Sequence, residues 1–92
     1  MKWRIVFTDD YRARAKRFLQ RHPDFASRYF KTIELMEADP RHPSLRLHAL
    51  NGKLTGLHSV SIKLSYRITI KMEIRWHEIV PVYVWVHDEV YR

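Results

Sequence analysis

Two groups of residues in this sequence could do chemistry, and the first lies in the closing stretch VWVHDEVYR. A strand-like apolar run ends there at His87, and Tyr91 follows four residues later. An imidazole can move a proton near neutral pH, and an aromatic ring about one helical turn away can stack on a nucleobase. A strand-end histidine satisfied by backbone groups is the alternative interpretation, and the pattern alone leaves both open.

The second group is basic. Between residues 40 and 77 there are seven Lys or Arg and four His against a single acid. Lys63, Arg67 and Lys71 recur at intervals of four, with Ser and Thr between them, so a regular strand would place all three on one face. Hydroxyls there can bind phosphate oxygens, and a guanidinium can stabilise charge on a reacting phosphate. His87, Arg67 and Tyr91 are together what metal-free RNA cleavage requires, although a solvated face that discourages aggregation has the same pattern.

The composition is that of one folded domain, residues 1–92, with 46% hydrophobic residues. A formal net charge of +7 would attract polyanions, of which nucleic acid is the commonest. No apolar stretch approaches the roughly 20 residues that span a bilayer, and residues 1–7 do not resemble a signal peptide, so we expect a cytoplasmic protein with no membrane partner. The absence of cysteine excludes thiol nucleophiles, disulfides and Cys-based zinc sites. The histidines lack the i, i+4 spacing of a helical metal site, so a metal is not favoured.

The first half of the chain predicts a strand and a helical hairpin. Trp3, Ile5 and Phe7 alternate with Arg4 and Val6, which indicates a short strand, and Thr8 then offers a side-chain oxygen to cap a helix. Pro23 interrupts that helix and opens a second amphipathic helix over residues 24–38. The first helix is apolar on one face and cationic on the others, and its cations could contact RNA phosphates or an acidic protein, or could simply be solvated. These cations include Arg12, Arg14, Arg17 and Arg21.

The second half predicts a sheet, because every even residue from 60 to 74 is apolar and every odd residue is polar. The run is too long for one strand, so we expect a turn near residues 64–66. A third strand, EIVPVYVWV, should begin effectively at Val82, since Pro81 obstructs regular pairing. The predicted fold is α+β: a small antiparallel sheet, formed by the first strand and a three-stranded meander, with two helices packed on its apolar face. The other face, carrying Lys63, Arg67 and Lys71, would be bare.

Two segments carry a resemblance to a known family. LHALNGKLTGLHSVSIKLSYRI (residues 47–68) and VHDEVY (residues 86–91) resemble the RelE/ParE superfamily of toxins from bacterial toxin–antitoxin pairs, in particular its YafQ-like branch. Length, basicity and the order of the elements agree as well. The resemblance implies a RelE/ParE-like fold and a ribosome-dependent mRNA endonuclease that is held inactive by an antitoxin, with no metal or organic cofactor.

The resemblance also implies roles for single residues. His48 matches the first histidine of the branch, and His87 matches its late catalytic histidine. Lys63 and Arg67 match basic strand positions, and Tyr91 matches the aromatic residue near the C-terminus. Where YafQ-like nucleases have a second histidine and an aspartate, this chain has two serines, Ser61 and Ser65. Serine is not a general acid or base at neutral pH, so proton transfer would depend on the two histidines.

The leading hypothesis is therefore an mRNA-cutting toxin. Arg67 would hold the scissile phosphate, His87 and His48 would serve the 2′-hydroxyl and the leaving oxygen, and Lys63, Lys71 and Tyr91 would bind RNA. Its partners would be an acidic antitoxin and mRNA on the ribosome. Two alternatives stay open: a non-catalytic inhibitor of DNA gyrase, which the same superfamily contains, and an RNA-binding module without catalytic activity.

Overall fold

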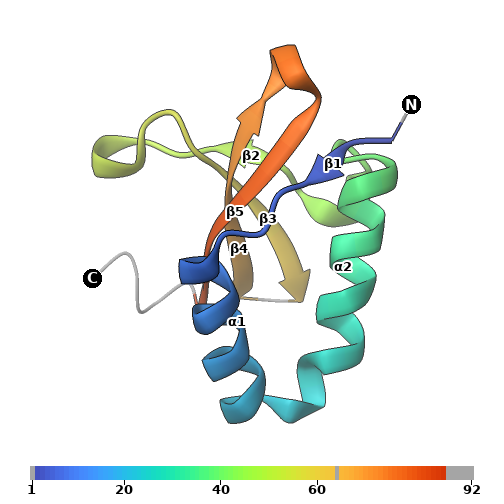
Figure 1. The fold of residues 1–92 in the computed structure, drawn as a ribbon, viewed down its shortest axis with the longest axis vertical. Coiled ribbons are helices and arrows are strands. Elements are labelled where there is room, and N and C mark those ends of the chain that lie inside the picture. Colours follow the sequence, from blue (N-terminus) through green and yellow to red (C-terminus); the bar gives the residue numbers. More distant parts are fainter. Residues whose placement is uncertain (1, 64, 87–92) are drawn as a thin grey trace.

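The computed structural model describes residues 2–63 and 65–86, which form two α-helices and a five-stranded sheet (Figure 1). Helix α1 spans Asp9–Arg21 and helix α2 spans Ala26–Ala38. The sheet has the strand order β1-β5-β4-β3-β2. This arrangement confirms the predicted α+β fold class. The strands are β1 Arg4–Ile5, β2 His48–Ala49, β3 His58–Lys63, β4 Tyr66–Glu73 and β5 Glu78–Val86.

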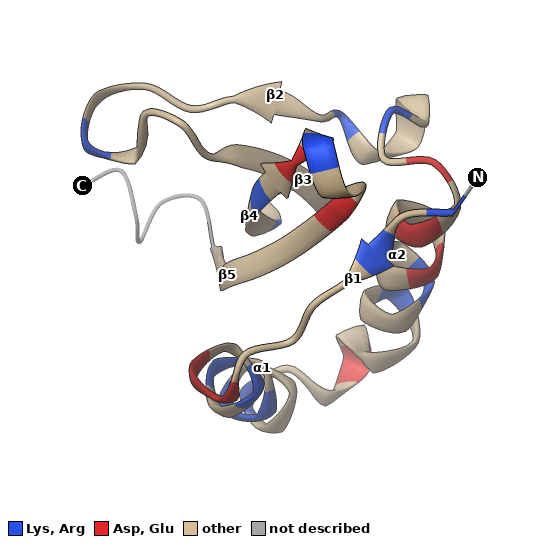
Figure 2. Cartoon of the chain, turned by 45° about the horizontal axis from the view of Figure 1, so that its top comes forward, with Lys and Arg blue, Asp and Glu red and all other residues tan. Residues whose placement is uncertain are grey.

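Local signals set the start of α1 as the sequence predicted, whereas α2 begins at Ala26, two residues after the predicted start. The Thr8 Oγ1 atom accepts a hydrogen bond from the Tyr11 amide at 3.1 Å. Asp9 and Asp10 lie in the first turn of α1, near the positive end of the helix dipole. Pro23 opens a short 3₁₀ turn that leads into α2. After its acidic first turn, α1 is mainly basic on its exposed surface (Figure 2).

A buried pair of hydroxyl groups joins the two helices. The Tyr11 and Tyr29 hydroxyl oxygens lie 2.7 Å apart, and the two residues are only 1% and 4% exposed. Burial raises the pKa of both phenols, because a phenolate would be poorly solvated there. Both side chains therefore stay protonated in the folded protein under alkaline conditions in which an exposed tyrosine ionises.

Strands β3, β4 and β5 form the predicted antiparallel meander, and the predicted turn falls between the end of β3 and the start of β4. Two other pairings were not predicted. β1 runs parallel to β5, with Arg4 opposite Glu78, so the expectation of a wholly antiparallel sheet is wrong for this strand. The two side chains also form an ion pair. β2 pairs antiparallel with β3 through only two residues.

The predicted start of the last strand at Val82 is also wrong, because β5 begins at Glu78 and continues through Pro81. The register between β4 and β5 shifts at this point, between Thr69 and Ile70. On the opposite edge of β5, the described pairing with β1 ends two residues before the proline. Proline lacks the N–H that a regular ladder needs, and a bulge beside an unpaired edge tolerates it.

The hydrophobic core lies between the helical hairpin and one face of the sheet (Figure 1). The even-numbered residues Val60, Ile68 and Ile70 are fully buried on the sheet side, as the alternation predicted. Phe18 of α1 and Met36 of α2 pack against them in the same cluster. Within residues 2–63 and 65–86, no helix is both long enough and apolar enough to cross a membrane.

The opposite face of the sheet is not bare, so that expectation is wrong. Ser59 and Thr69 are 0% exposed, and Ser61 and Trp85 are below 9%. The Trp85 indole Nε1–H donates a hydrogen bond to the Thr69 hydroxyl at 2.5 Å, so one large ring covers part of this face. The alternation predicts solvated polar residues at the odd-numbered positions, but a tryptophan on the neighbouring strand and the pairing of β2 with β3 exclude water from several of them.

Candidate functional site

The face of the sheet opposite the helices carries a row of three side chains, one from each strand of the meander. Ser61 of β3 lies opposite Arg67 of β4, and Arg67 lies opposite Trp85 of β5. Residues directly opposite in antiparallel strands project from the same face, with Cβ atoms about 4.5–5.5 Å apart. Their chain neighbours Ile68 and Val84 belong to the helix-side packing, which places the row on the other face. We call these three residues the Arg67 row.

The guanidinium of Arg67 has incomplete hydrogen bonding. Its Nε and Nη1 atoms are buried, and neither has a hydrogen-bond partner among the residues that the structure describes. The ion pairs of the described chain join other side chains, Arg4 with Glu78 and Lys71 with Glu73. A buried donor without a partner costs about 1–3 kcal/mol, and more when it is charged. An anion with several acceptor oxygens, such as a phosphate, is the ligand that would satisfy it.

Hydroxyl groups lie on the same face of the sheet, two residues along the strands from the Arg67 row. Ser59 of β3 is opposite Thr69 of β4, and both are buried. The Thr69 hydroxyl accepts from Trp85, whereas the Ser59 Oγ atom has no hydrogen-bond partner in the described part of the chain. Arg67 and Ser59 thus both have unsatisfied polar atoms on one face of the sheet, and Ser59, unlike the partly exposed Arg67, is closed to solvent.

His48 reaches the same face from the edge of the sheet. It lies on β2 directly opposite Ser59, so it projects from the face that carries the Arg67 row. Its imidazole Nδ1 is 3.1 Å from the Arg46 carbonyl oxygen. A carbonyl oxygen only accepts, so in the neutral ring Nδ1 carries the proton and Nε2 has the free lone pair. One strand separates His48 from Arg67, which is about 10 Å between strand axes, so the two residues share a face without contact.

Lys63 departs from the predicted placement. The register between β3 and β4 shifts after Ser61, so Lys63 lies opposite Tyr66, whose ring packs against the helix-side core. An extra residue in one strand reverses the alternation beyond it, and the predicted shared face of Lys63 and Arg67 is therefore wrong. The lysine side chain is exposed at the end of β3.

Lys71 lies on the same face of β4 as Arg67, because the two are separated by an even number of residues, but it is not close to Arg67. It lies four residues further along β4, roughly 13 Å away at the usual rise of a strand. Its Nζ atom forms an ion pair with the Glu73 carboxylate at 2.9 Å, and its side chain is exposed. Lys71 could therefore contact a more distant part of a bound strand, and its charge is partly neutralised in the free protein.

His87 and Tyr91 lie outside the described residues, since β5 ends at Val86. The two serines at the positions where the YafQ-like branch has a histidine and an aspartate are described. Ser61 is buried in the Arg67 row, and Ser65 is exposed in the turn before β4. Of the predicted site residues that the structure describes, it brings Arg67 and His48 to one face and places Lys63 elsewhere.

Sequence alone did not single out Trp85 or Ser59 as parts of the site. Both have odd numbers like Arg67, and the alternation could therefore have placed them on its face. The register shift at the proline in β5 prevents that inference for the last strand, because alternation no longer predicts the face there. In the described chain, no three His, Asp or Glu side chains gather closely enough to hold a metal ion.

The fold built by these elements is that of RelE/ParE-like toxins, since solved structures of such toxins superpose on nearly the whole chain. YafQ from E. coli strain BL21(DE3) covers 99% of this chain with 100% of its own, at a TM-score of 0.78 and 12% sequence identity. A YoeB/ParE toxin from Agrobacterium tumefaciens covers 91% of this chain with 98% of its own, at a TM-score of 0.71 and 16% identity. The predicted resemblance is thereby confirmed at the level of the fold.

A chain of the E. coli DinJ-YafQ toxin-antitoxin complex is similar over 100% of both chains, with a TM-score of 0.76 and 14% identity. No protein-family model matches the sequence, and no curated protein is significantly similar to it. A shared fold at such low identity does not fix an activity, so the function must be argued from the site.

Proposed function

We propose that this chain is the toxin of a type II toxin–antitoxin system and acts as a ribosome-dependent mRNA endoribonuclease without a metal. The observation that carries the proposal is the Arg67 guanidinium on the face of the sheet opposite the helices, whose buried Nε and Nη1 atoms have no hydrogen-bond partner among the described residues. A phosphodiester offers the anionic oxygens that such a group lacks. The likeness of the fold to YafQ and to YoeB/ParE toxins supports the same class.

In the proposed reaction an imidazole takes the proton of the ribose 2′-hydroxyl, and the resulting oxygen attacks the adjacent phosphorus. The bond from phosphorus to the 5′-oxygen breaks, and a second imidazole protonates that oxygen. His48 suits the role of base, because its Nδ1–H is held by the Arg46 carbonyl and its Nε2 can accept. His87 would be the acid. Arg67 would stabilise the charge that develops on the phosphate oxygens.

Two partners follow from the proposal. The substrate is mRNA on the translating ribosome, and the inhibitor is an acidic antitoxin that covers the basic protein. The net charge of +7 favours association with both. The DinJ-YafQ complex shows that a protein of this fold binds an antitoxin.

The test is cleavage of mRNA on purified translating ribosomes by the wild type and by Arg67→Ala. Loss of a group that stabilises transition-state charge typically lowers the rate about 10²- to 10³-fold. Arg41→Ala is the matched control, because Arg41 is an exposed arginine in the loop after α2, remote in sequence from the sheet face. We expect the control to cut at the wild-type rate.

Cutting by Arg67→Ala at the wild-type rate would contradict the proposal. A wild type that cuts no mRNA but inhibits DNA supercoiling would replace it with the gyrase-inhibitor alternative. If the wild type binds RNA and neither cuts it nor affects gyrase, the chain is a non-catalytic RNA-binding module.

A further inference from the structure

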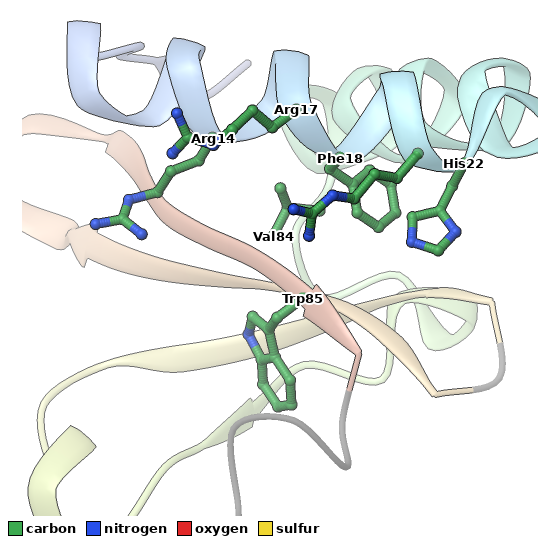
Figure 3. A pocket seen from close by; sticks show the side chains of 7 residues that line it. Arg14, Arg17, Phe18, His22, Val84 and Trp85 are labelled. Carbon is green, nitrogen blue, oxygen red and sulfur yellow. The ribbon is translucent and has the colours of Figure 1, made fainter.

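A second basic site lies between helix α1 and the end of β5. A pocket of about 390 Å³ opens there, lined on the helix side by Arg14, Arg17 and Arg21 and on the strand side by Val84 and Trp85 (Figure 3). None of the described residues that line this pocket is an acid. We call it the α1–β5 pocket.

The spacing of the three arginines explains why they share one pocket. Positions i, i+3 and i+7 fall on one face of a helix, and the intervening Phe18 is 7% exposed in the core, which fixes that face against β5. None of the three has a carboxylate partner among the ion pairs of the described chain. Like charges held this close repel one another, so an anion bound among them would be stabilised.

Arg14, unlike the other two arginines, already contacts an aromatic ring of the protein. Its guanidinium carbon lies 4.8 Å from the centre of the Tyr83 ring, in a cation–π contact. Arg14 also lines a neighbouring groove together with Asp10, one helical turn earlier. Arg17 and Arg21 are therefore the cations that remain available to a ligand in the α1–β5 pocket.

Trp85 connects this pocket to the Arg67 row. It lines the pocket, and it is also the residue of β5 directly opposite Arg67. Figure 3 shows the Val84 side chain pointing toward α1 and the Trp85 indole pointing away from it. The two cationic sites thus lie on either side of β5, and Trp85 borders both of them.

We propose that the α1–β5 pocket is a second phosphate-binding subsite, which takes a phosphate of the same RNA strand whose scissile phosphate lies at Arg67. The identity of the ligand rests on the proposed function. An RNA strand carries a phosphate at every nucleotide, so one strand can satisfy both sites, whereas an acidic side chain would satisfy one. Guanidinium groups bind phosphate oxygens in pairs, without regard to the base, so the subsite would position RNA and not read its sequence.

The experiment compares two double variants that lose the same charge from the same helix. Arg17→Gln/Arg21→Gln removes cations of the α1–β5 pocket. Arg12→Gln/Lys16→Gln removes two exposed cations that line a different groove, on the side of α1 near Tyr29. The probe is a single-stranded 2′-O-methyl oligonucleotide, which cannot be cleaved, and its affinity is measured as a function of salt concentration. Binding is therefore read independently of cleavage.

Each phosphate contact in single-stranded nucleic acid contributes about 0.7 to the slope of log K against log salt. Since the pocket takes one phosphate, we expect the pocket variant to lose about 0.7 from that slope, equally for oligonucleotides of different sequence, and the control variant to keep the wild-type slope. Equal losses in the two variants would overturn the subsite, because general charge would then explain them.

Two further outcomes separate this inference from the proposed function. If the wild type cuts mRNA and the pocket variant binds the oligonucleotide like the wild type, the subsite is wrong and the proposed function stands. If the pocket variant instead loses affinity only for an acidic peptide or protein, the pocket is a protein-docking site and the inference is overturned. A wild type that does not bind the oligonucleotide overturns the subsite, and the cleavage assay on ribosomes decides the proposed function separately.

Discussion

Replacing Arg67 by methionine should make the protein more stable and less active at the same time. The buried Nε and Nη1 atoms of Arg67 have no hydrogen-bond partner in the described structure, so they are a source of instability that a bound anion would relieve. Methionine keeps an unbranched apolar stem beside Trp85 and Ser61 without the charge. The proposed catalytic role favours arginine at this position, whereas folding favours an apolar side chain.

The size of the effect follows from the two unpaired atoms. Each buried, unsatisfied donor costs about 1–3 kcal/mol, but the residue as a whole is only partly buried, so water relieves some of that cost. We expect a net gain of about 1–3 kcal/mol in the free energy of unfolding. For a domain of this size each kcal/mol raises Tm by about 4–8 °C. Cleavage should fall about 10²- to 10³-fold.

Urea unfolding and ribosomal mRNA cleavage, measured on the same preparations, test the expected gain in stability and the expected loss of activity. Arg41→Met is the control, since that side chain is exposed, and it should change neither quantity. An unchanged m-value would show that the compactness of the two states is the same. If Arg67→Met unfolds more easily than the wild type by more than about 1 kcal/mol, the guanidinium has a structural partner and the reasoning is refuted.

Three more predictions follow from the site and the core. His87→Ala should lower mRNA cleavage about 10²- to 10⁴-fold, and Tyr91→Ala should weaken RNA binding by about 1–3 kcal/mol, with antitoxin affinity retained in both; undiminished cleavage by His87→Ala would exclude an acid–base role. Association with an acidic antitoxin should slow as salt rises in stopped-flow mixing, and equal rates at low and high ionic strength would exclude the basic surface as the docking site. Above pH 10 the folded protein should lose stability by about 1.4 kcal/mol per pH unit for each of Tyr11 and Tyr29. Their raised pKa keeps them protonated when folded, while the unfolded chain releases the protons, so stability is full below pH 10 and falls above it. In urea unfolding, the free energy of unfolding of Tyr11→Phe/Tyr29→Phe should fall less steeply with pH above pH 10 than that of the wild type. Equal slopes in the two proteins would contradict this assignment.

The parts of the fold that the sequence predicted are those set by neighbouring residues. The Thr8 cap, the Pro23 interruption and the period-two alternation each act over a few positions, and all three appear as expected. The parallel pairing of β1 with β5 joins Arg4 to Glu78, which are separated by most of the chain, and only two residues of each strand take part. No local pattern encodes a contact of that kind.

The site was predictable up to the first irregularity in each strand. Arg67 was placed on the correct face because β4 is regular at that point. The alternation failed at Lys63, where one extra residue in β3 changes the register with β4. Such a bulge depends on how two strands twist against each other, and the side-chain sequence alone does not record it. Trp85 was not predicted as part of the site for the same reason, since the register of β5 shifts between Glu78 and Trp85.

The core packs on one face of the sheet and the proposed site lies on the other, so the position of a substitution decides whether its effect on activity can be interpreted. The helix-side core is built from residues such as Ile68 and Ile70, whose loss would unfold the protein. Arg67 lies outside that cluster and has unpaired polar atoms in the described chain, so replacing it leaves the core packing in place. Trp85 is different, because it is 5% exposed and hydrogen-bonded to Thr69 while it also borders both cationic sites. A Trp85 variant would lose folding and binding together, so only substitutions at the polar positions can separate a failure of catalysis from a failure of the fold.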